Sequence, residues 1–385
     1  MQKLFRITTV SLSLDKLLHG QLGFMSKYYN VVGISSADDR LNYVGGREGV
    51  KTIGLEMTRK ITPAQDLKAT WQLYKLLKKE KPLIVHTHTP KAGIVGMLAA
   101  KMAGVPHRLH TVAGLPLLVA TGNKRKVLNF VEKFTYSLAT KVYPNSFGLK
   151  QIIQQEGFCK DDKLKVIGQG SSNGIDTTYF SPGAVSNEQK EHLKSELSIT
   201  DDNFVFLNVG RLVGDKGINE LVQAFVALHK LHPQAKLLLV GPFESDLDPL
   251  QADTEKTIHD HPAIIETGFQ PDVRPYLAIA DALAFPSYRE GFPNVVMQAG
   301  AMGLPSIVTN INGCNEIVVE GKNGIIIPVK DAQALQLSMS NFITDRSSFA
   351  AMQQQARPMI CDRYEQHVVW NELLKEYRSL EAASA

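Results

Sequence analysis

The sequence predicts an α/β protein built from two doubly wound domains. At 385 residues the chain is too long for one ordinary hydrophobic core and suits two domains of roughly 180 residues each. Short apolar runs typical of buried strands alternate along the chain with segments of helical spacing. In the second half a strand runs through a glycine-rich loop into a helix, the unit from which doubly wound domains are assembled.

The first domain is expected to span residues 1–177. Residues 4–14 alternate like a strand, and Gly20–Gly23 opens a helix. Basic residues surround the apolar positions of two expected helices, 62–81 and 122–136. The expected strands are Phe5–Val10, Val31–Ser35, Leu83–Val85, Arg108–Val112 and Val142–Asn145.

The second domain is expected to span residues 178–364, after an Asn-Gly turn (Asn173-Gly174) and a charged linker, Glu188–Glu196. Its expected strands are Phe204–Val209, Lys236–Val240, Ile264–Glu266, Ala282–Phe285, Pro305–Thr309 and Ile325–Pro328. Its expected helices are Ile218–Leu231, Tyr276–Ala280, Asn294–Met302, Ala332–Ile343 and Ser348–Arg357, before a last helix at Gln366–Tyr377.

The charge is distributed unevenly. Residues 1–180 hold 26 Lys and Arg against 12 Asp and Glu, although the whole chain carries only +4. A basic half indicates an anionic partner such as a membrane surface, and solvated helix faces explain it equally well. The sequence shows no recognisable nucleic-acid-binding motif.

We expect a protein of the cytoplasm. The three cysteines are far apart, and no apolar stretch is long enough to span a bilayer. The N-terminus lacks the apolar core and cleavage site of a signal peptide.

Two patterns could indicate a metal, and we interpret neither as a metal site. His86 and His88 are expected on opposite faces of a strand end with no third ligand near them. The acidic triplet Asp246-Leu247-Asp248 is expected in a solvated, proline-flanked loop. The strand-end position of His88 and the nearby Lys91 favours contact with a ligand instead.

Two stretches of the second domain are suited to a diphosphate with a sugar attached. Gly210-Arg211 and Lys216 lie between a strand and a helix, and their two kinds of cation suit two phosphates. Glu290 lies in the loop before the short helix that begins at Asn294, and that helix points its free N–H groups toward the end of the strand. A carboxylate there is suited to sugar hydroxyls.

These stretches resemble the donor site of retaining glycosyltransferases of family GT4. The family carries two glutamates eight positions apart, and here these positions are Glu290 and Gln298. The resemblance covers nearly the whole chain and implies the GT-B fold, with two Rossmann-like domains facing each other across a cleft. It also implies that the last helix, about 365–385, packs back on the first domain.

The resemblance implies roles for individual residues. Arg211, Lys216 and Glu290 would act on the donor, and the remaining donor contacts would be Gly210, Gly20, Phe269, Phe292, Pro293, Asn294, Val295 and Gln298. His88 and Lys91 would face the acceptor. Related enzymes often carry a histidine where this chain has Ala113. We keep His110, three residues earlier, as a candidate catalytic residue, although its side chain is expected about 10 Å away on the other face of the strand.

The implied function is metal-independent sugar transfer, with retention, from a nucleotide-sugar to a polyprenyl-diphosphate-linked saccharide. The likeness to bacterial surface-polysaccharide enzymes implies capsule or O-antigen assembly, a UDP-linked donor, and attachment to the inner face of the cell membrane through the basic first domain. No cofactor is expected, since the nucleotide-sugar is a substrate. A non-catalytic nucleotide-sugar-binding subunit and a sugar epimerase or phosphorylase of the same fold remain alternatives.

Overall fold

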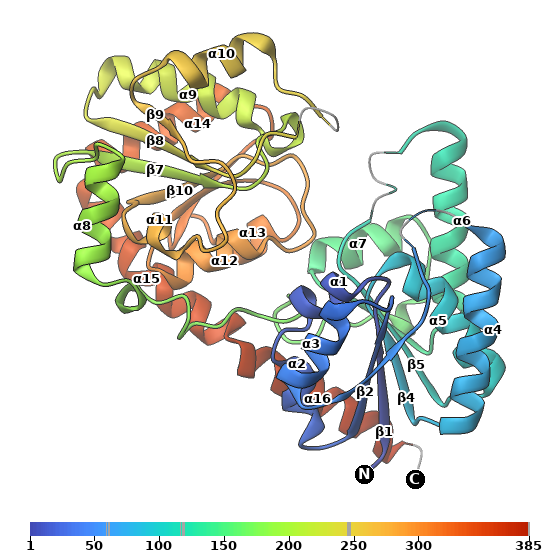
Figure 1. Ribbon diagram of the computed structural model, residues 1–385. Helices are drawn as coiled ribbons and strands as arrows, with labels where there is room; N and C mark the ends of the chain where they lie inside the picture. The colour runs from blue at the N-terminus through green and yellow to red at the C-terminus, as the bar shows by residue number, and fades with distance from the viewer. Residues whose placement is uncertain (59, 61, 116, 118–119, 245–247, 384–385) are drawn as a thin grey trace. The chain divides into compact units, whose positions relative to one another are not determined.

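A computed structural model describes residues 1–58, 60, 62–115, 117, 120–244 and 248–383. The chain divides into two compact units (Figure 1). Unit 1 contains Met1–Gly174 and His367–Ala385, and unit 2 contains Ile175–Gln366. The last helix therefore belongs to the unit formed by the first half of the chain. No helix in the described ranges combines the length and apolar character needed to cross a bilayer.

Unit 1 contains a six-stranded parallel sheet in the order β3-β2-β1-β4-β5-β6. The strand order reverses between the neighbouring strands β1 and β4, where Arg6 pairs in register with His86. At such a reversal the crossover helices diverge to opposite faces and leave space for a ligand. The strands are β1 (Lys3–Ile7), β2 (Asn30–Ser35), β3 (Lys51–Gly54), β4 (Ile84–Thr87), β5 (His107–Val112) and β6 (Lys141–Pro144).

Helices cover both faces of this sheet, so apolar cores lie on both sides. One face packs against α4 (Pro63–Glu80), α5 (Pro90–Ala103), α6 (Gly122–Leu138) and α7 (Phe147–Gln155). The other face packs against α1 (Ser11–Leu17), α2 (Gln21–Ser26), α3 (Asp39–Glu48) and α16 (Gln366–Ala382). In α16, Trp370, Leu373 and Tyr377 are buried against residues of the first half of the chain.

The prediction of a strand through Leu14 was wrong. The first strand ends at Ile7, and Ser11–Leu17 is a helix. Leu14 and Leu18 are four residues apart and both fully buried, which fits a helical stripe.

Unit 2 repeats the topology with a second six-stranded parallel sheet, in the order β12-β11-β10-β7-β8-β9. Here the strand order reverses between β7 and β10, which are hydrogen-bonded neighbours. The strands are β7 (Phe204–Val209), β8 (Ala235–Val240), β9 (Ile264–Glu266), β10 (Ala282–Phe285), β11 (Ser306–Thr309) and β12 (Gly324–Ile327).

The helices of unit 2 also lie on both faces of its sheet. One core includes residues of α9 (Ile218–Leu231), α10 (Ala252–Asp260) and α14 (Ala332–Thr344). The other includes residues of α8 (Asn187–Glu196), α11 (Arg274–Ala278), α12 (Asn294–Ala301) and α13 (Cys314–Ile317), and α15 (Arg346–Tyr364) contributes to both.

Two predictions about unit 2 need correction. The charged segment Glu188–Glu196 is not a linker but lies in helix α8, whose first turn is closed by a capping box between Ser186 and Gln189. Helix α15 does not stop before Pro358 but continues to Tyr364. Packing outweighs the bond that proline removes, because the buried Ile360 packs closely against Gly300 of α12.

Gly20 ends the turn before α2 and packs against the last helix. Its φ is +76°, and a Cβ at this position would lie 2.7 Å from Cη2 of Trp370. Its N–H already donates to Oε1 of Glu48 over 2.9 Å. The structure thus favours a turning and packing role for Gly20 rather than contact with a ligand.

We expect Gly20→Ala to destabilise the protein by roughly 1–3 kcal/mol, because alanine is strained at this φ and its methyl group overlaps Trp370. Gly49→Ala is a matched control, since Gly49 has a φ of +64° but a Cβ added there would meet nothing within 4 Å. Urea unfolding measures the free energy of unfolding of both variants. An equal decrease in the two would show that the contact with Trp370 contributes nothing to the effect of Gly20→Ala.

Candidate active site

The candidate active site lies where the strand order of unit 2 reverses. Gly210 and Arg211 directly follow β7, and Glu290 lies in the loop that follows β10. Because parallel neighbours end at the same edge of a sheet, these residues converge although they are far apart in sequence.

A tight turn brings Lys216 to this edge. Gly214–Lys216 forms one 3-10 turn, and Gly217 follows it with a φ of +70° at the start of α9. A Cβ on Gly217 would lie 2.1 Å from the carbonyl oxygen of Pro286, just after β10. Only glycine lets the two loops approach so closely.

Lys216 and Glu290 form an ion pair across the two loops. The ammonium of Lys216 contacts Oε1 of Glu290, and the hydroxyl of Ser287 donates to the same oxygen over 2.9 Å. The exposed fractions of the two charged side chains are 18% and 15%. The carboxylate is thus held in place while its second oxygen is left for other contacts.

Arg211 is paired with a carboxylate that sequence reasoning did not find. Its Nη1 donates to Oε2 of Glu244 over 2.9 Å, in the loop that follows β8. This hydrogen bond raises the pKa of Arg211, and the charges of Glu244, Asp215 and Glu290 raise it further. Arg211 therefore lies close enough to Asp215 and Glu290 for their charges to act on it.

The loop before α12 is fixed from the segment that follows β11. The amide of Asn312 donates to the carbonyl oxygens of Glu290 and Gly291. The ring of Phe292 packs edge-on against Tyr364, so its side chain is buried and only its backbone can contact a ligand. This arrangement sets the direction of the helix that follows.

The first turn of α12 presents N–H groups at the site. Pro293 is its N-cap and is itself buried, Asn294 is exposed, and Val295 is half-buried. The N–H groups of the first helical residues have no partner within a helix and favour anions. Gln298 lies one turn further along and is half-buried.

Two further predicted positions lie in loops of unit 2. The ring of Phe269 is 73% exposed in the loop after β9, where it could stack on a planar group. Asp246 and Leu247 of the acidic triplet lie outside the described residues. Asp248 accepts a hydrogen bond from the backbone N–H of Asp215, so it supports the Arg211–Lys216 loop.

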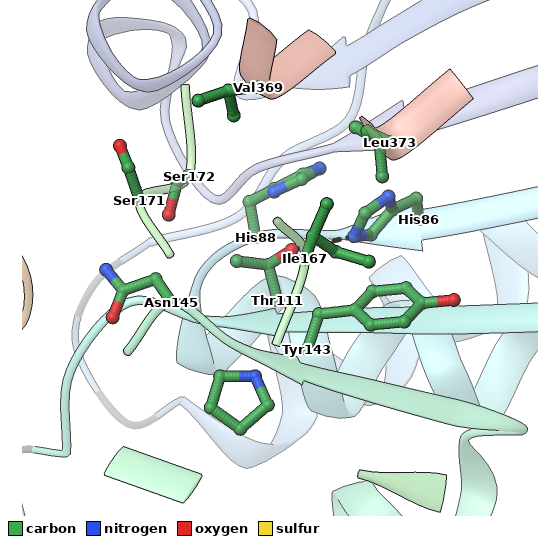
Figure 2. A pocket seen from close by; sticks show the side chains of 11 residues that line it. His86, His88, Thr111, Tyr143, Asn145, Ile167, Ser171, Ser172, Val369 and Leu373 are labelled. Atoms are coloured by element: carbon green, nitrogen blue, oxygen red, sulfur yellow. Dashed lines mark hydrogen bonds between the residues drawn. The ribbon is translucent and has the colours of Figure 1, made fainter. Parts of the chain in front are cut away.

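In unit 1, the prediction that His86 and His88 occupy opposite faces was wrong. Their ring centroids are 4.2 Å apart, because residues two apart along a strand share a face. Figure 2 shows both rings beside Thr111, which bonds Nε2 of His86 over 2.8 Å. Across the described ranges, no three His, Cys, Asp or Glu side chains are grouped as a metal site would need.

Two other predicted residues of unit 1 face away from these histidines. His110 lies on the opposite face of the sheet, where Nδ1 bonds Thr87 over 2.7 Å and the ring packs under Gly93 of α5. Alternation along β5 causes this placement, and we drop His110 as a catalytic candidate. Lys91 pairs with Asp66 of α4 over 2.7 Å and is only 10% exposed, so it holds two helices together rather than a ligand.

Sequence reasoning missed several residues that organise the site. Glu244, Ser287 and Asn312 each follow a strand, and that position is the one signal that could have indicated them. A strand-end polar residue is common in any α/β domain, so the signal alone would not have separated them from others.

Two doubly wound units, one with a phosphate-suited site where its strand order reverses, fit the GT-B fold. The family model "Glycosyl transferases group 1" matches residues 189–359, and "Glycosyl transferase 4-like" matches residues 17–146. The chain belongs to this glycosyltransferase family and is an enzyme.

Three individual proteins are similar to this chain in sequence or in fold. It is 33% identical to the capsular polysaccharide biosynthesis glycosyltransferase CapM of Staphylococcus aureus, over 98% of this chain and 97% of that protein. It is also 33% identical, over 71% and 70% of the two chains, to the Escherichia coli UDP-Gal:alpha-D-GlcNAc-diphosphoundecaprenol alpha-1,3-galactosyltransferase. The fold matches that of Anabaena HepE, crystallised with UDP, with a TM-score of 0.80, 18% identity and coverage of 98% and 100%.

We expect Glu244→Gln to bind UDP about threefold to fivefold more tightly, because the diphosphate would no longer compete with a carboxylate for Arg211. An ion pair this exposed is worth no more than about 1 kcal/mol, which sets the size of the effect. Titration calorimetry measures it, and Glu188→Gln on the exposed start of α8 is the control for lost charge. Unchanged or weaker UDP binding in Glu244→Gln would contradict the competition.

Proposed function

We propose that the enzyme transfers a sugar from a UDP-sugar to a saccharide linked to polyprenyl diphosphate, with retention of configuration and without a metal. The convergence of Arg211, Lys216 and Glu290 where the strand order of unit 2 reverses carries this proposal. The proposed place of action is the inner face of the cell membrane, in the assembly of a surface polysaccharide.

In this mechanism unit 2 holds the donor. Arg211 and Lys216 bind the diphosphate, and the N–H groups at the start of α12 stabilise the charge that grows on it as the sugar leaves. Glu290 accepts hydrogen bonds from sugar hydroxyls. Two cations and a helix N-terminus supply the positive charge that a metal supplies in other enzymes.

The segment around Gly268 and Phe269 and the half-buried Gln298 complete the donor contacts. We assign the nucleotide base to the segment around Gly268 and Phe269, and the ribose to Gln298. A glutamine in place of the family's second glutamate forms a neutral hydrogen bond, so donor affinity falls by about 1 kcal/mol and activity survives.

Ala113 leaves unit 1 without the histidine that related enzymes often carry at this position. In a retaining reaction at one face of the sugar, the departing phosphate itself can take the proton from the attacking hydroxyl. The proposal therefore assigns proton removal to the donor diphosphate rather than to a side chain. The names of the compared proteins support the substrates: capsule synthesis for CapM, a lipid-diphosphate acceptor for the E. coli enzyme, and UDP for HepE.

Exposed apolar and basic side chains on the helices α4 and α6 of unit 1 support contact with a membrane. Leu67 and Trp71 of α4 are 70% and 50% exposed, and Val127 and Phe130 of α6 are 52% and 68% exposed. The two helices also carry exposed lysines at positions 68, 75, 78, 79, 124, 126 and 133. Aromatic and lysine side chains together are typical of helices that lie on anionic bilayers.

We expect Arg211→Ala and Glu290→Ala each to abolish measurable transfer. Arg211→Ala removes a contact with the diphosphate, and Glu290→Ala removes the hydrogen bonds to the sugar hydroxyls. A thermal-shift screen over nucleotide-sugars identifies the donor first. Transfer is then measured in EDTA with a short-chain lipid-diphosphate N-acetylglucosamine acceptor, and NMR reads the anomeric configuration of the product.

Near-normal turnover in either variant would remove the proposed donor site, and inactivity of the wild type in EDTA would contradict the metal-free mechanism. Donor binding with neither transfer nor hydrolysis in the wild type would contradict the transfer reaction. Glu188→Ala is the control for the loss of a negative charge. Turnover that depends on added inorganic phosphate would indicate a phosphorylase instead of a transferase.

We expect the double variant Trp71→Ser, Phe130→Ser to bind phosphatidylglycerol-containing vesicles at least about tenfold more weakly, since two exposed rings would no longer enter the interface. Co-sedimentation measures the binding. Leu231→Ser is the control, because Leu231 is 65% exposed on α9 of unit 2. Equal vesicle binding by the wild type and the double variant would exclude these side chains as the membrane contact.

A further inference from the structure

The side chain of Asn312 holds two successive carbonyl groups of the loop between β10 and α12. Its amide nitrogen donates to the carbonyl oxygen of Glu290 and, over 3.2 Å, to that of Gly291. An amide group carries two N–H hydrogens, so one asparagine can satisfy both oxygens. Asn312 is half-buried and lies in the segment that follows β11, the strand next to β10 in the sheet.

These two carbonyl groups fix the direction of the N–H groups that follow them. Every described peptide bond is trans, and in a trans peptide the N–H points opposite to the carbonyl oxygen. The N–H groups of Gly291 and Phe292 therefore point away from Asn312. A Cβ on Gly313 would lie 2.5 Å from the carbonyl oxygen of Gly291 and 3.0 Å from Cα of Phe292, so the segment after β11 closely covers the carbonyl side of the loop.

The order of the strands decides what lies on the N–H side of the loop. Strand β10 lies between β11 and β7, and the segment after β7 brings Arg211 and Lys216 to the same edge of the sheet. The carboxylate of Glu290 turns to that side, because its Oε1 contacts Lys216. The two N–H groups and the carboxylate thus face the cations of the candidate site from one loop.

The N–H groups of Gly291 and Phe292 have no hydrogen-bond partner among the described residues. Phe292 is buried, and the N–H groups of buried residues are almost always paired. Two unpaired donors in succession therefore indicate an oxygen atom from outside the chain.

The neighbouring carboxylate indicates which kind of oxygen this is. Lys216 and Ser287 both contact Oε1 of Glu290, so Oε2 is left to accept from a ligand. Donors beside an acceptor suit hydroxyl groups, because a hydroxyl both accepts and donates. A phosphate oxygen only accepts, and a carboxylate would repel it.

We propose that Asn312 is a positioning residue for the donor sugar. It orients the N–H groups of Gly291 and Phe292 toward hydroxyl oxygens of the sugar, while Glu290 accepts from the hydroxyl groups. Asn312 acts through the backbone, because both of its hydrogen bonds end on carbonyl oxygens. The inference rests on the proposed function and adds to it a residue that determines sugar binding without touching the sugar.

Two substitutions of Asn312 test this role through binding rather than turnover. Asn312→Ala removes both hydrogen bonds, and Asn312→Asp keeps the size but replaces the donor by a carboxylate that repels the two carbonyl oxygens. Calorimetry with UDP-glucose, UDP-galactose, UDP-N-acetylglucosamine and UDP-N-acetylgalactosamine selects the UDP-sugar that binds the wild type most tightly. We expect both variants to bind that UDP-sugar about fivefold to tenfold more weakly, and to bind UDP within about twofold of the wild type.

Asn315→Ala is the matched control. The amide of Asn315 is exposed in the same segment and donates to Asn310 instead of the loop, so we expect this variant to bind both ligands as the wild type does. Urea unfolding shows that each variant is folded, and Asn312→Ala decides alone if Asn312→Asp is not. Equal weakening of UDP and UDP-sugar binding would overturn the inference, because a loosened loop or a phosphate contact affects both ligands.

Glu290→Ala distinguishes a failure of this inference from a failure of the proposed function. We expect it to weaken binding of the UDP-sugar but not of UDP. If it does so while the Asn312 variants bind the UDP-sugar like the wild type, the positioning role is overturned and the donor site stands. If Glu290→Ala leaves UDP-sugar binding unchanged, the proposed function itself fails.

A crystal of the wild type with the selected UDP-sugar tests the same claim without a variant. Sugar hydroxyl groups within hydrogen-bond distance of the N–H groups of Gly291 and Phe292 support the inference. A sugar that contacts neither N–H group overturns it.

Discussion

The ion pair between Lys216 and Glu290 is the contact on which the candidate site depends. Its partners are 74 positions apart in sequence, and they meet because β7 and β10 are parallel neighbours where the strand order reverses. Ser287 and Asn312 fix the loop of Glu290, and Gly217 allows the loop of Lys216 to approach it. The carboxylate of Glu290 thus has an ammonium partner in a half-buried position.

Arg211 is also paired with a carboxylate. Both cations suited to a diphosphate are paired with carboxylates, Arg211 with Glu244 and Lys216 with Glu290. The two pairs are not equivalent, because the side chains of the first are 38% and 35% exposed and those of the second only 18% and 15%.

Unit 1 repeats the strand order with different chemistry. Its strand ends carry a buried layer of Arg6, His86 and His88, held by Gln21, Tyr377 and Trp370 rather than by carboxylates. Burial lowers the pKa of both histidines and keeps them neutral, whereas the candidate site of unit 2 carries the cations of Arg211 and Lys216. The two units thus carry different side-chain chemistry on one topology, and α16 supplies part of the buried layer in unit 1.

The amino-acid sequence was enough to predict the α/β class and the position of most strands, because apolar runs and strand–loop–helix motifs are local features of consecutive residues. The donor-binding roles of Arg211, Lys216 and Glu290 stay a prediction. The sequence was not enough to predict that Glu188–Glu196 is a helix, that His110 is enclosed between the sheet and α5, or that Lys91 is paired with Asp66. Those outcomes depend on which face of a strand packs against which helix. Glu244, the tautomer of His88 and the role of Gly20 became evident only in the folded chain, since each depends on a partner brought close by folding: Arg211, Arg6 and Trp370 respectively.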